Sequence, residues 1–426
     1  MTTQGKPCCE CPASACKDLT KLIVNSDSER EINKLPITID ENRVIEGAIE
    51  ILRVIRPHWD LERVHFKMFT DGITNKLVGC FYQSKEDEGQ RGDNDTNHQQ
   101  PTPQMNGNNH AGATDAVSES ANENTETVKT SIFDTTDPEN VVLVRVYGNK
   151  TDMLIDRKAE TRNIRLMHQH GFAPQLFAIF KNGLAYEFIP GETLNPQKVR
   201  LPEVWRLVAV RMAQMHKIDC GPKVAKTPML PSTMEKFFNL VPNVFSDPVK
   251  HERLKDTFLP IQKLRDDFAD LLARLEKLQS PVVFAHNDLL LTNIIYTESL
   301  NRVTFIDYEY AAYNFQAFDI GNHFAEFAGV DEVDYSRYPS KEFQLNWLRV
   351  YLEEYQSPGQ VTEKDVERLY VAVNQFALAA HYLWIVWGLI QAEYSTIDFN
   401  YAEYALMRYK EYLAKRDQFL SLEYKD

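Results

Sequence analysis

Short apolar runs predominate in the first part of the chain. Before Pro190, five segments are rich in β-branched and aromatic residues, a composition typical of strands. They are 63–69, 76–82, 141–147, 176–180 and 184–188. The last two are separated by a Lys-Asn-Gly turn, which predicts a hairpin. Apolar residues spaced three and four apart predict a helix over 44–55, with Thr38 and Asp40 as candidate caps, and another over 152–169.

After Pro190 the pattern becomes helical. The helices predicted there are 202–217, 251–279, 341–354 and 363–394. Two short apolar strands, 282–284 and 303–306, interrupt this part. A small antiparallel sheet with one or two helices, followed by a large helical part, predicts a two-lobed α+β fold.

The composition changes abruptly at Ser84. Between Ser84 and Thr130 there are nine acidic and three basic residues, a net charge of −6, and no aromatic residue. Such a segment cannot bury enough apolar surface to offset its ordering entropy, so we predict a disordered insert, inert in the simpler interpretation and regulatory in the alternative. The domains expected are a flexible tail over 1–35, an N-terminal lobe over 36–83 and 141–190, the insert over 84–140, and a helical lobe over 191–426.

The overall charge limits the class of partner. The chain has 61 acidic and 47 basic residues among 426, a net charge of −14. This excess argues against nucleic acid as a partner, because that interaction requires basic residues that neutralise phosphates. It fits a cationic or metal-chelated ligand better. The apolar share of 43% excludes a wholly disordered or collagen-like chain.

No segment predicts secretion or membrane insertion. The first residues lack an apolar stretch, and the longest apolar run, 376–390, has 15 residues interrupted by His381, fewer than the roughly 20 that span a bilayer. We therefore expect a buried helix there and a cytoplasmic protein without integral membrane association. Four cysteines lie close together without a zinc-type partner pair, so a reduced or lipidated tail is favoured over a metal site. They are Cys8, Cys9, Cys11 and Cys16.

The most informative segment follows the predicted strand 282–284 and contains His286, Asp288 and Asn293. Phosphoryl transfer from a nucleotide needs a carboxylate for the hydroxyl proton and an oxygen ligand for Mg²⁺, and protein kinases supply both with the same Asp-x4-Asn spacing. Asp307 ends the next strand, fourteen residues after Asn293, where a second magnesium ligand is expected. Together these residues predict a kinase-type site rather than a set of turn caps.

Polar residues recur at helical spacing just beyond this point: Asp319, then Asn322 or His323, then Glu326. Their types would suit a metal, but Mg²⁺ usually takes one or two carboxylates together with phosphates. We therefore expect Asp319 to brace the catalytic loop through its backbone and Glu326 to point into the site. For His323, a hydrogen-bonded core histidine is the favoured interpretation.

These motifs closely resemble the choline/ethanolamine kinase family. The resemblance rests on the loop 286–296, on Phe-Ile-Asp-Tyr-Glu-Tyr at 305–310 and on Phe-Asp-Ile-Gly-Asn-His-Phe-Ala-Glu-Phe at 318–327. It implies a protein-kinase-like fold that transfers the γ-phosphate of ATP to the hydroxyl of an amino alcohol. It also implies that Asp288 is the catalytic base, that Asn293 and Asp307 hold Mg²⁺, and that His286, Asp319 and His323 give structural support.

The resemblance further assigns residues before Pro190 to ATP. The segment 70–76, which includes Thr74 and Asn75, stands where the family has its phosphate loop. Arg145 stands where protein kinases have a lysine, with Glu160 on the next helix as its partner. Residues Glu187 to Ile189 resemble the hinge that binds adenine through backbone groups.

The acceptor pocket must hold a small ammonium, which aromatic faces and carboxylates attract. Trp384 and Trp387 lie three apart and hence on one helix face. Alone, such a stripe would indicate core packing, but the resemblance implies that it surrounds the substrate amine. The resemblance adds Tyr310, Tyr335 and Tyr404 to this pocket, and Glu326 as the charge partner.

Within the family, the substrate is indicated by three segments. Residues 289–292, 186–189 and 394–397 resemble ethanolamine kinases, whereas choline kinases carry a more polar Gln-Glu-Gly run in the loop. The resemblance thus implies phosphorylation of ethanolamine to phosphoethanolamine, the first step of the CDP-ethanolamine route to phosphatidylethanolamine. Choline kinase or dual specificity is the alternative.

More remote alternatives are a kinase of another small amine, such as an aminoglycoside-like compound, and a non-catalytic kinase-like scaffold. A protein kinase is disfavoured because no Ala-Pro-Glu signature follows Asp307. The sequence leaves the oligomeric state open, with a homodimer as one alternative.

Overall fold

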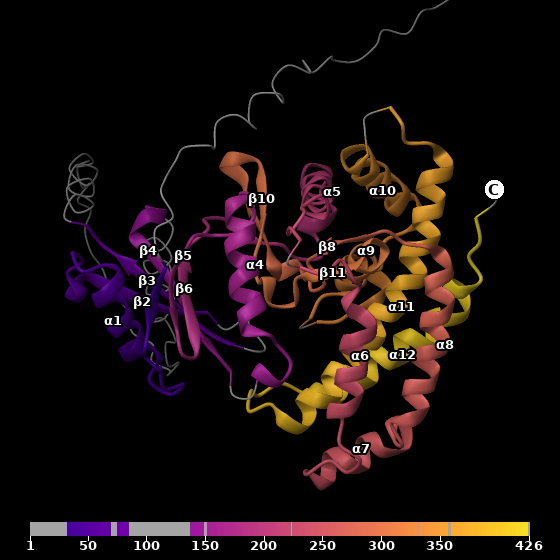
Figure 1. Ribbon diagram of the computed structural model, residues 1–426, viewed down its shortest axis with the longest axis horizontal. Coiled ribbons are helices and arrows are strands. Elements are labelled where there is room, and N and C mark those ends of the chain that lie inside the picture. Colours follow the sequence, from indigo (N-terminus) through magenta and orange to yellow (C-terminus); the bar gives the residue numbers. More distant parts are fainter. Residues whose placement is uncertain are drawn as a thin grey trace, which may run out of the picture.

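The computed structural model describes residues 32–69, 75–84, 137–148, 151–222, 224–330, 332–356 and 359–424. A lobe built on a six-stranded sheet lies beside a larger, mainly helical lobe (Figure 1). This confirms the predicted two-lobed α+β architecture. Thr74, the four tail cysteines and most of the acidic insert lie outside the described residues.

The N-terminal lobe is a sheet with the strand order β1-β5-β6-β4-β3-β2. Its strands are β1 (Asn33–Leu35), β2 (Val64–Phe69), β3 (Asn75–Tyr82), β4 (Val141–Tyr147), β5 (Leu176–Phe180) and β6 (Gly183–Glu187). Neighbouring strands are antiparallel except for β1 and β5, which are parallel. Strands β3 and β4 pair directly, Phe81 opposite Val141, so the acidic segment connects the adjacent ends of two neighbouring strands.

Two predictions for this lobe are wrong in detail. The flexible tail was expected to reach residue 35, but Asn33–Leu35 form β1 and pair with Ala178–Phe180. A three-residue polar strand has no readable apolar pattern, and its pairing depends on the exposed edge of β5. Helix α1 (Val44–Ile55) has Arg43 at its N-cap without a side-chain cap bond, so neither Thr38 nor Asp40 caps it.

Helix α1 packs its apolar face on the sheet and closes a small core there. Helix α4 (Arg157–Gln169) lies between the sheet and the helical lobe (Figure 1). It starts later than the predicted 152–169, because Asp156 accepts hydrogen bonds from the backbone N–H groups of Lys158 and Ala159 and so caps the helix. Arg157, the first residue of α4, contacts Glu309 of the C-terminal lobe.

The C-terminal lobe contains a large apolar core that reaches from α4 to the last helix. Its helices are α5 (Pro202–His216), α6 (Met229–Leu240), α7 (Pro248–Phe258), α8 (Gln262–Leu275), α9 (Gln316–Ala325), α10 (Lys341–Tyr355), α11 (Glu363–Tyr394) and α12 (Tyr401–Leu420). Its short strands are β7 (Glu192–Thr193), β8 (Val282–Ala285), β9 (Ile294–Thr297), β10 (Arg302–Phe305) and β11 (Ala312–Phe315). The single helix predicted for 251–279 is two helices, α7 and α8, because Pro260 between them lacks the N–H that a continuous helix requires.

Helix α11 is the central helix of this lobe. A capping box starts it, in which Thr362 and Asp365 exchange side-chain and backbone hydrogen bonds. In the part of the chain that the structure describes, it is the one helix long and apolar enough to cross a membrane, and its apolar window is entirely buried inside the protein. A helix that is apolar all round and covered by neighbouring helices is typical of a protein core.

Candidate active site

The catalytic-loop candidates follow strands of two short antiparallel pairs. Strand β8 pairs with β11 and ends at Ala285, and the loop that follows carries His286 and Asp288. Strand β10 pairs with β9 and ends at Phe305, two residues before Asp307. Both carboxylates therefore stand at strand ends, in loops whose bases are held by backbone pairing.

Asp319 on α9 holds the loop through its backbone. One carboxylate oxygen accepts from the His286 N–H at 2.9 Å and the other from the Asn287 N–H at 2.6 Å. His216 lies 2.9 Å from the same carboxylate through Nε2. Burial raises the pKa of Asp319, but the hydrogen bond and charge of His216 outweigh it and keep the pKa below its ordinary value. Asp319 is thus a fixed carboxylate that presents two acceptors to the loop.

Three further contacts define the loop. Asn287 adopts a left-handed conformation at φ 66° and donates through Nδ2 to the Tyr310 carbonyl at 2.9 Å. The His286 ring lies 2.9 Å from the Ile306 carbonyl, and the His323 ring lies 3.1 Å from the Leu289 carbonyl. Burial lowers the pKa of both histidines, that of His323 to about 4, so both rings are neutral at pH 7. These histidines join loop segments rather than supplying charge.

Asn293 and Asp307 present the oxygen atoms that a hard cation prefers. Asn293 donates through Nδ2 to the Asp288 carbonyl at 2.9 Å, which leaves its side-chain oxygen for another partner. Asp307 has a left-handed backbone at φ 65°. Both residues line one cavity of about 190 Å³. An amide oxygen and a carboxylate on one wall fit the ligand chemistry of Mg²⁺.

Arg145 on β4 reaches across the two lobes to this wall. Its guanidinium donates to Asp307 at 2.8 Å and to Glu309, and it lies 3.6 Å from Glu160 on α4. Arg157 joins the same cluster, 3.0 Å from Glu160 and 3.3 Å from Glu309. Burial, and then the nearby Asp307 charge, raise the pKa of Glu309 to about 7. Three carboxylates and two guanidiniums therefore form one buried charge cluster between the lobes.

The cavity beside this cluster combines residues of both lobes. Asn75, Leu77, Arg145 and Tyr186 come from the sheet, and Thr292, Asn293, Ile306 and Asp307 come from the C-terminal lobe. Glu187 and Ile189, predicted as a hinge, lie at and just after the end of β6 and are not among its lining residues. The Glu187 carboxylate accepts from the Gln175 N–H at 2.9 Å, which ties β6 to the start of β5.

The aromatic residues predicted for the acceptor pocket do come together. Trp384 and Trp387 on α11 meet edge to face at 5.6 Å, and Tyr310 packs edge to face on Trp384 at 5.4 Å. The Trp387 Nε1–H donates to the Tyr310 hydroxyl at 2.9 Å. Tyr404 on α12 lies 5.9 Å from Trp387. Because α9, α11 and α12 pack together, residues nearly 100 positions apart form one aromatic cluster.

Glu326, predicted to meet the substrate amine, is paired within the protein. It is 1% exposed, and its Oε1 accepts from Arg408, which is 3% exposed. Glu326 Oε2 is buried and has no hydrogen-bond partner among the described residues. Burial lowers the pKa of Arg408, but Glu326 more than compensates and keeps the guanidinium cationic. Tyr335 lies at the edge of this pair and packs on His381 at 5.6 Å.

Asp288 is close to both clusters, since its charge interacts with Asp307 and Glu309 and also with the Tyr310 and Tyr404 hydroxyls. It is 8% exposed. Burial raises its pKa well above the ordinary value, and the charges of Asp307, Glu309 and Glu326 add to this effect while Arg408 opposes it. A carboxyl group with a raised pKa in a cleft is suited to accepting a proton.

Sequence reasoning assigned no role to four residues of the site: Arg157, Glu309, Asn322 and Arg408. Glu309 is part of the Ile-Asp-Tyr-Glu-Tyr motif, and its spacing from Asp307 could have indicated it. Asn322 lies in the α9 motif and accepts from Trp384 Nε1 at 2.7 Å. Nothing in the local pattern points to Arg157 or Arg408, because their importance comes from partners that lie far away in the sequence.

The strand-end carboxylates, the Arg145–Glu160 pair and the two lobes define a class, the phosphotransferases with a protein-kinase-like fold. A sequence profile described as choline/ethanolamine kinase matches residues 114–413. The chain belongs to the choline/ethanolamine kinase family.

Relatives and solved structures agree with this assignment. The chain is 52% identical to an ethanolamine kinase of Drosophila melanogaster over 93% of this chain and 82% of that protein. It is 41% identical to ethanolamine kinase 1 of Homo sapiens over 92% of this chain and 77% of that protein. A Plasmodium vivax ethanolamine kinase structure matches with a TM-score of 0.67 and 23% identity, covering 88% of this chain and 89% of that one. At that identity the structure supports the fold alone.

Proposed function

We propose that this protein is an ATP-dependent ethanolamine kinase that forms phosphoethanolamine and so begins the CDP-ethanolamine route to phosphatidylethanolamine. The observation that carries the proposal is that Asp288 interacts both with Asp307, which pairs with Arg145, and with Tyr310, which bonds to Trp387. Relatives at 41–52% identity that carry the name ethanolamine kinase support the same reaction.

In the proposed reaction, Asp288 accepts the proton of the ethanolamine hydroxyl. The hydroxyl oxygen forms a bond to the γ-phosphorus of ATP while the bond to the β–γ bridging oxygen breaks, and ADP leaves. Asn293 and Asp307 would hold Mg²⁺, which neutralises phosphate charge when bound. Arg145 adds a second positive charge beside the same phosphates, and Glu160 and Glu309 orient its guanidinium. Thr74, Asn75, Glu187 and Ile189 are proposed as further ATP contacts.

The acceptor pocket favours a primary ammonium. The rings of Tyr310, Trp384, Trp387 and Tyr404 would attract any small organic cation. Glu326 Oε2, buried and without a partner among the described residues, can in addition accept a hydrogen bond. An ethanolamine ammonium donates such a bond and a choline trimethylammonium does not, so the unsatisfied acceptor discriminates between them. Choline as substrate, alone or together with ethanolamine, is the alternative.

We further propose that the protein works in the cytoplasm on small soluble substrates, without nucleic acid or membrane insertion. The complete burial of the apolar window of α11 supports this, as do the free thiols of Cys80 and Cys220. A homodimer is compatible with this function.

The decisive experiment compares kcat/KM for ethanolamine and choline with Mg-ATP as donor, using purified full-length protein. We expect turnover of both, with at least a tenfold preference for ethanolamine. A preference for choline would refute the substrate assignment. If neither amine, nor an aminoglycoside, is phosphorylated, the non-catalytic scaffold becomes the better interpretation.

A further inference from the structure

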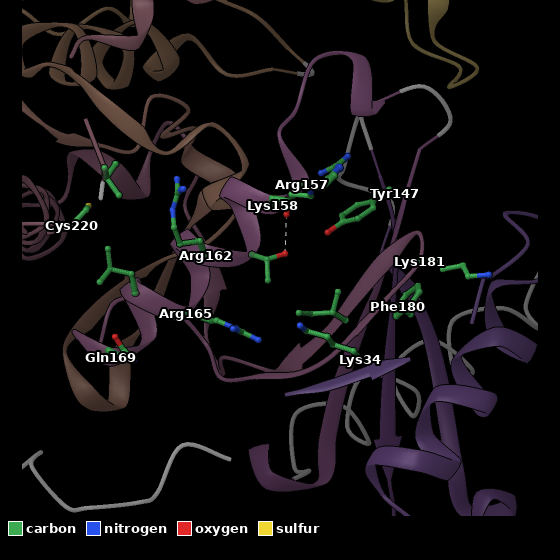
Figure 2. A pocket seen from close by; sticks show the side chains of 14 residues that line it. Lys34, Tyr147, Arg157, Lys158, Arg162, Arg165, Gln169, Phe180, Lys181 and Cys220 are labelled. Atoms are coloured by element: carbon green, nitrogen blue, oxygen red, sulfur yellow. Dashed lines mark hydrogen bonds between the residues drawn. The ribbon is translucent and has the colours of Figure 1, made fainter. Parts of the chain in front are cut away.

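A second cavity lies on the exposed side of α4, away from the aromatic cluster. Its volume is about 550 Å³, and Figure 2 shows the side chains around it. Six of the lining residues are basic and none is acidic. The basic residues are Lys34, Arg157, Lys158, Arg162, Arg165 and Lys181. In a chain with a net charge of −14, such a local excess of positive charge is unexpected.

Five of these six cations form no ion pair with any residue that the structure describes. In the described ranges, no ion pair involves Lys34, Lys158, Arg162, Arg165 or Lys181. In Figure 2 the charged ends of Arg165 and Lys34 point toward one another across the cavity. Like charges that converge on one space repel each other, and an anion placed between them would remove the repulsion.

The other lining residues indicate what kind of anion would fit. Leu166, Ile179, Phe180 and Val224 form an apolar part of the wall, and Arg157 stacks on the Tyr147 ring at 3.6 Å. The volume falls within the range of about 300–1,000 Å³ that is usual for small-molecule sites. Arginine side chains match phosphate groups with paired hydrogen bonds. An apolar wall together with a row of cations fits an organic polyphosphate.

Arg157 links this cavity to the charge cluster of the active site. It lines the cavity and also lies 3.0 Å from Glu160 and 3.3 Å from Glu309. Both carboxylates also contact Arg145, the cation next to Asp307. A ligand that draws the Arg157 guanidinium toward the cavity would leave Glu160 and Glu309 to attract Arg145 more strongly.

We propose that the α4 cavity is a regulatory site for a small molecule with two or more linked phosphates, and that its occupancy weakens ATP binding through Arg157. This site is separate from the catalytic one, and its phosphates are recognised by Arg165 on α4 and Lys34 opposite, whose charged ends face each other, with the charges of Lys158, Arg162 and Lys181 nearby. A nucleoside diphosphate and free polyphosphate share the required chemistry.

The test is calorimetric titration of the full chain with ADP and, separately, with tripolyphosphate. We expect two ADP sites in the wild type. In the triple variant Lys158→Gln, Arg162→Gln, Arg165→Gln, the affinity of the second site should fall at least tenfold, so that one site remains detectable. KM for ATP, measured without added ligand, should change less than twofold. The pair Lys34→Gln, Lys181→Gln on the opposite wall should weaken the same site.

A control variant separates the site from overall charge. Arg253→Gln, Lys255→Gln, Lys263→Gln removes three cations from exposed or half-buried positions of α7 and α8 and should retain both ADP sites. A single ADP site in the wild type, or a second site that survives the α4 changes, would overturn the proposal. Tripolyphosphate binding as tightly as ADP supports the site and identifies phosphate as the recognised group. A second site that appears only after deletion of residues 85–130 would instead identify that acidic segment as the occupant, against the proposal.

Discussion

At the scale of single residues, Asp288 connects the energetics of the fold to those of catalysis. Its carboxyl group is buried, and the nearby carboxylates of Asp307, Glu309 and Glu326 disfavour its ionised form. Since the folded-state pKa lies above the unfolded value, its ionisation lowers the stability of the folded protein as the pH rises through the folded pKa. The carboxylate charge that the proposed reaction needs therefore costs stability at neutral pH.

The variant Asp288→Asn tests whether this carboxylate is needed for activity and lowers the stability of the fold. We expect kcat to fall by about 10²–10⁴-fold, the range usual for loss of a general base. The free energy of unfolding at pH 8 should stay the same or rise, because a destabilising buried charge is removed. Activity assays and denaturant unfolding at pH 5 and pH 8 measure both, and the stability difference between wild type and variant should shrink at pH 5. Near wild-type kcat would exclude Asp288 as the base.

The Glu326–Arg408 pair makes a second prediction at this scale. Glu326→Gln leaves Arg408 buried without a counter-charge, which costs about 3–5 kcal/mol of stability, and it removes the acceptor proposed for the ammonium. We expect KM for ethanolamine to rise at least tenfold. In the double variant Glu326→Gln, Arg408→Met, stability should recover because the unpaired charge is gone, while KM stays high. A double variant with normal KM would show that Glu326 acts through folding alone.

At the scale of elements, the site depends on how closely α9 approaches α11. Gly321 lies at their contact, where an added Cβ would come within 2.6 Å of the Val373 carbonyl oxygen and 2.8 Å of the Ala377 nitrogen. Both are backbone atoms of a central helix and have little freedom to move. The glycine thus permits the spacing that brings Asp319 under the catalytic loop.

Gly321→Ala should therefore displace α9. We expect a loss of about 1–3 kcal/mol from overpacking, larger than the gain of about 1 kcal/mol in helix propensity, together with a drop in kcat as Asp319 moves. Gly47→Ala in α1 is the matched control. Its added Cβ would meet side-chain atoms of Ile39 within the N-terminal lobe, away from the contact between α9 and α11. That control should lose stability with kcat unchanged. Equal kinetic effects of both variants would argue against a role for the α9–α11 contact.

Long elements with one clear apolar period were predictable, and short or interrupted ones were predictable only in part. The range 363–394 was predicted for α11 with both ends correct. Helix α12 was missed, although it supplies Tyr404 and Arg408, because its aromatic and charged residues give no single apolar face. Strands β7, β9 and β11, two to four residues long, were not predicted, whereas the similarly short β8 and β10 were, from their apolar residues.

At the scale of the whole molecule, the acidic segment contributes a large part of the net negative charge of the chain. Deletion of residues 85–130 changes the net charge from −14 to −8. Strands β3 and β4 are neighbours in the sheet, so a short turn can join their ends. We expect kcat and KM for both substrates to stay within twofold of wild type. A tenfold loss of kcat/KM, with the fold intact by circular dichroism, would make the segment part of the catalytic machinery.

By itself, the sequence determined the class of chemistry and the order of the lobes. Its evidence was local: the Asp288-x4-Asn293 spacing, the strand-end Asp307 and the 318–327 motif. Such local patterns can be recognised without knowledge of the fold. The tertiary structure decided what surrounds them: Glu309 and Arg157 beside Arg145, and Arg408 on Glu326. These pairs join residues 82–164 positions apart. Such contacts depend on how helices and sheets pack, and a linear pattern carries no record of that.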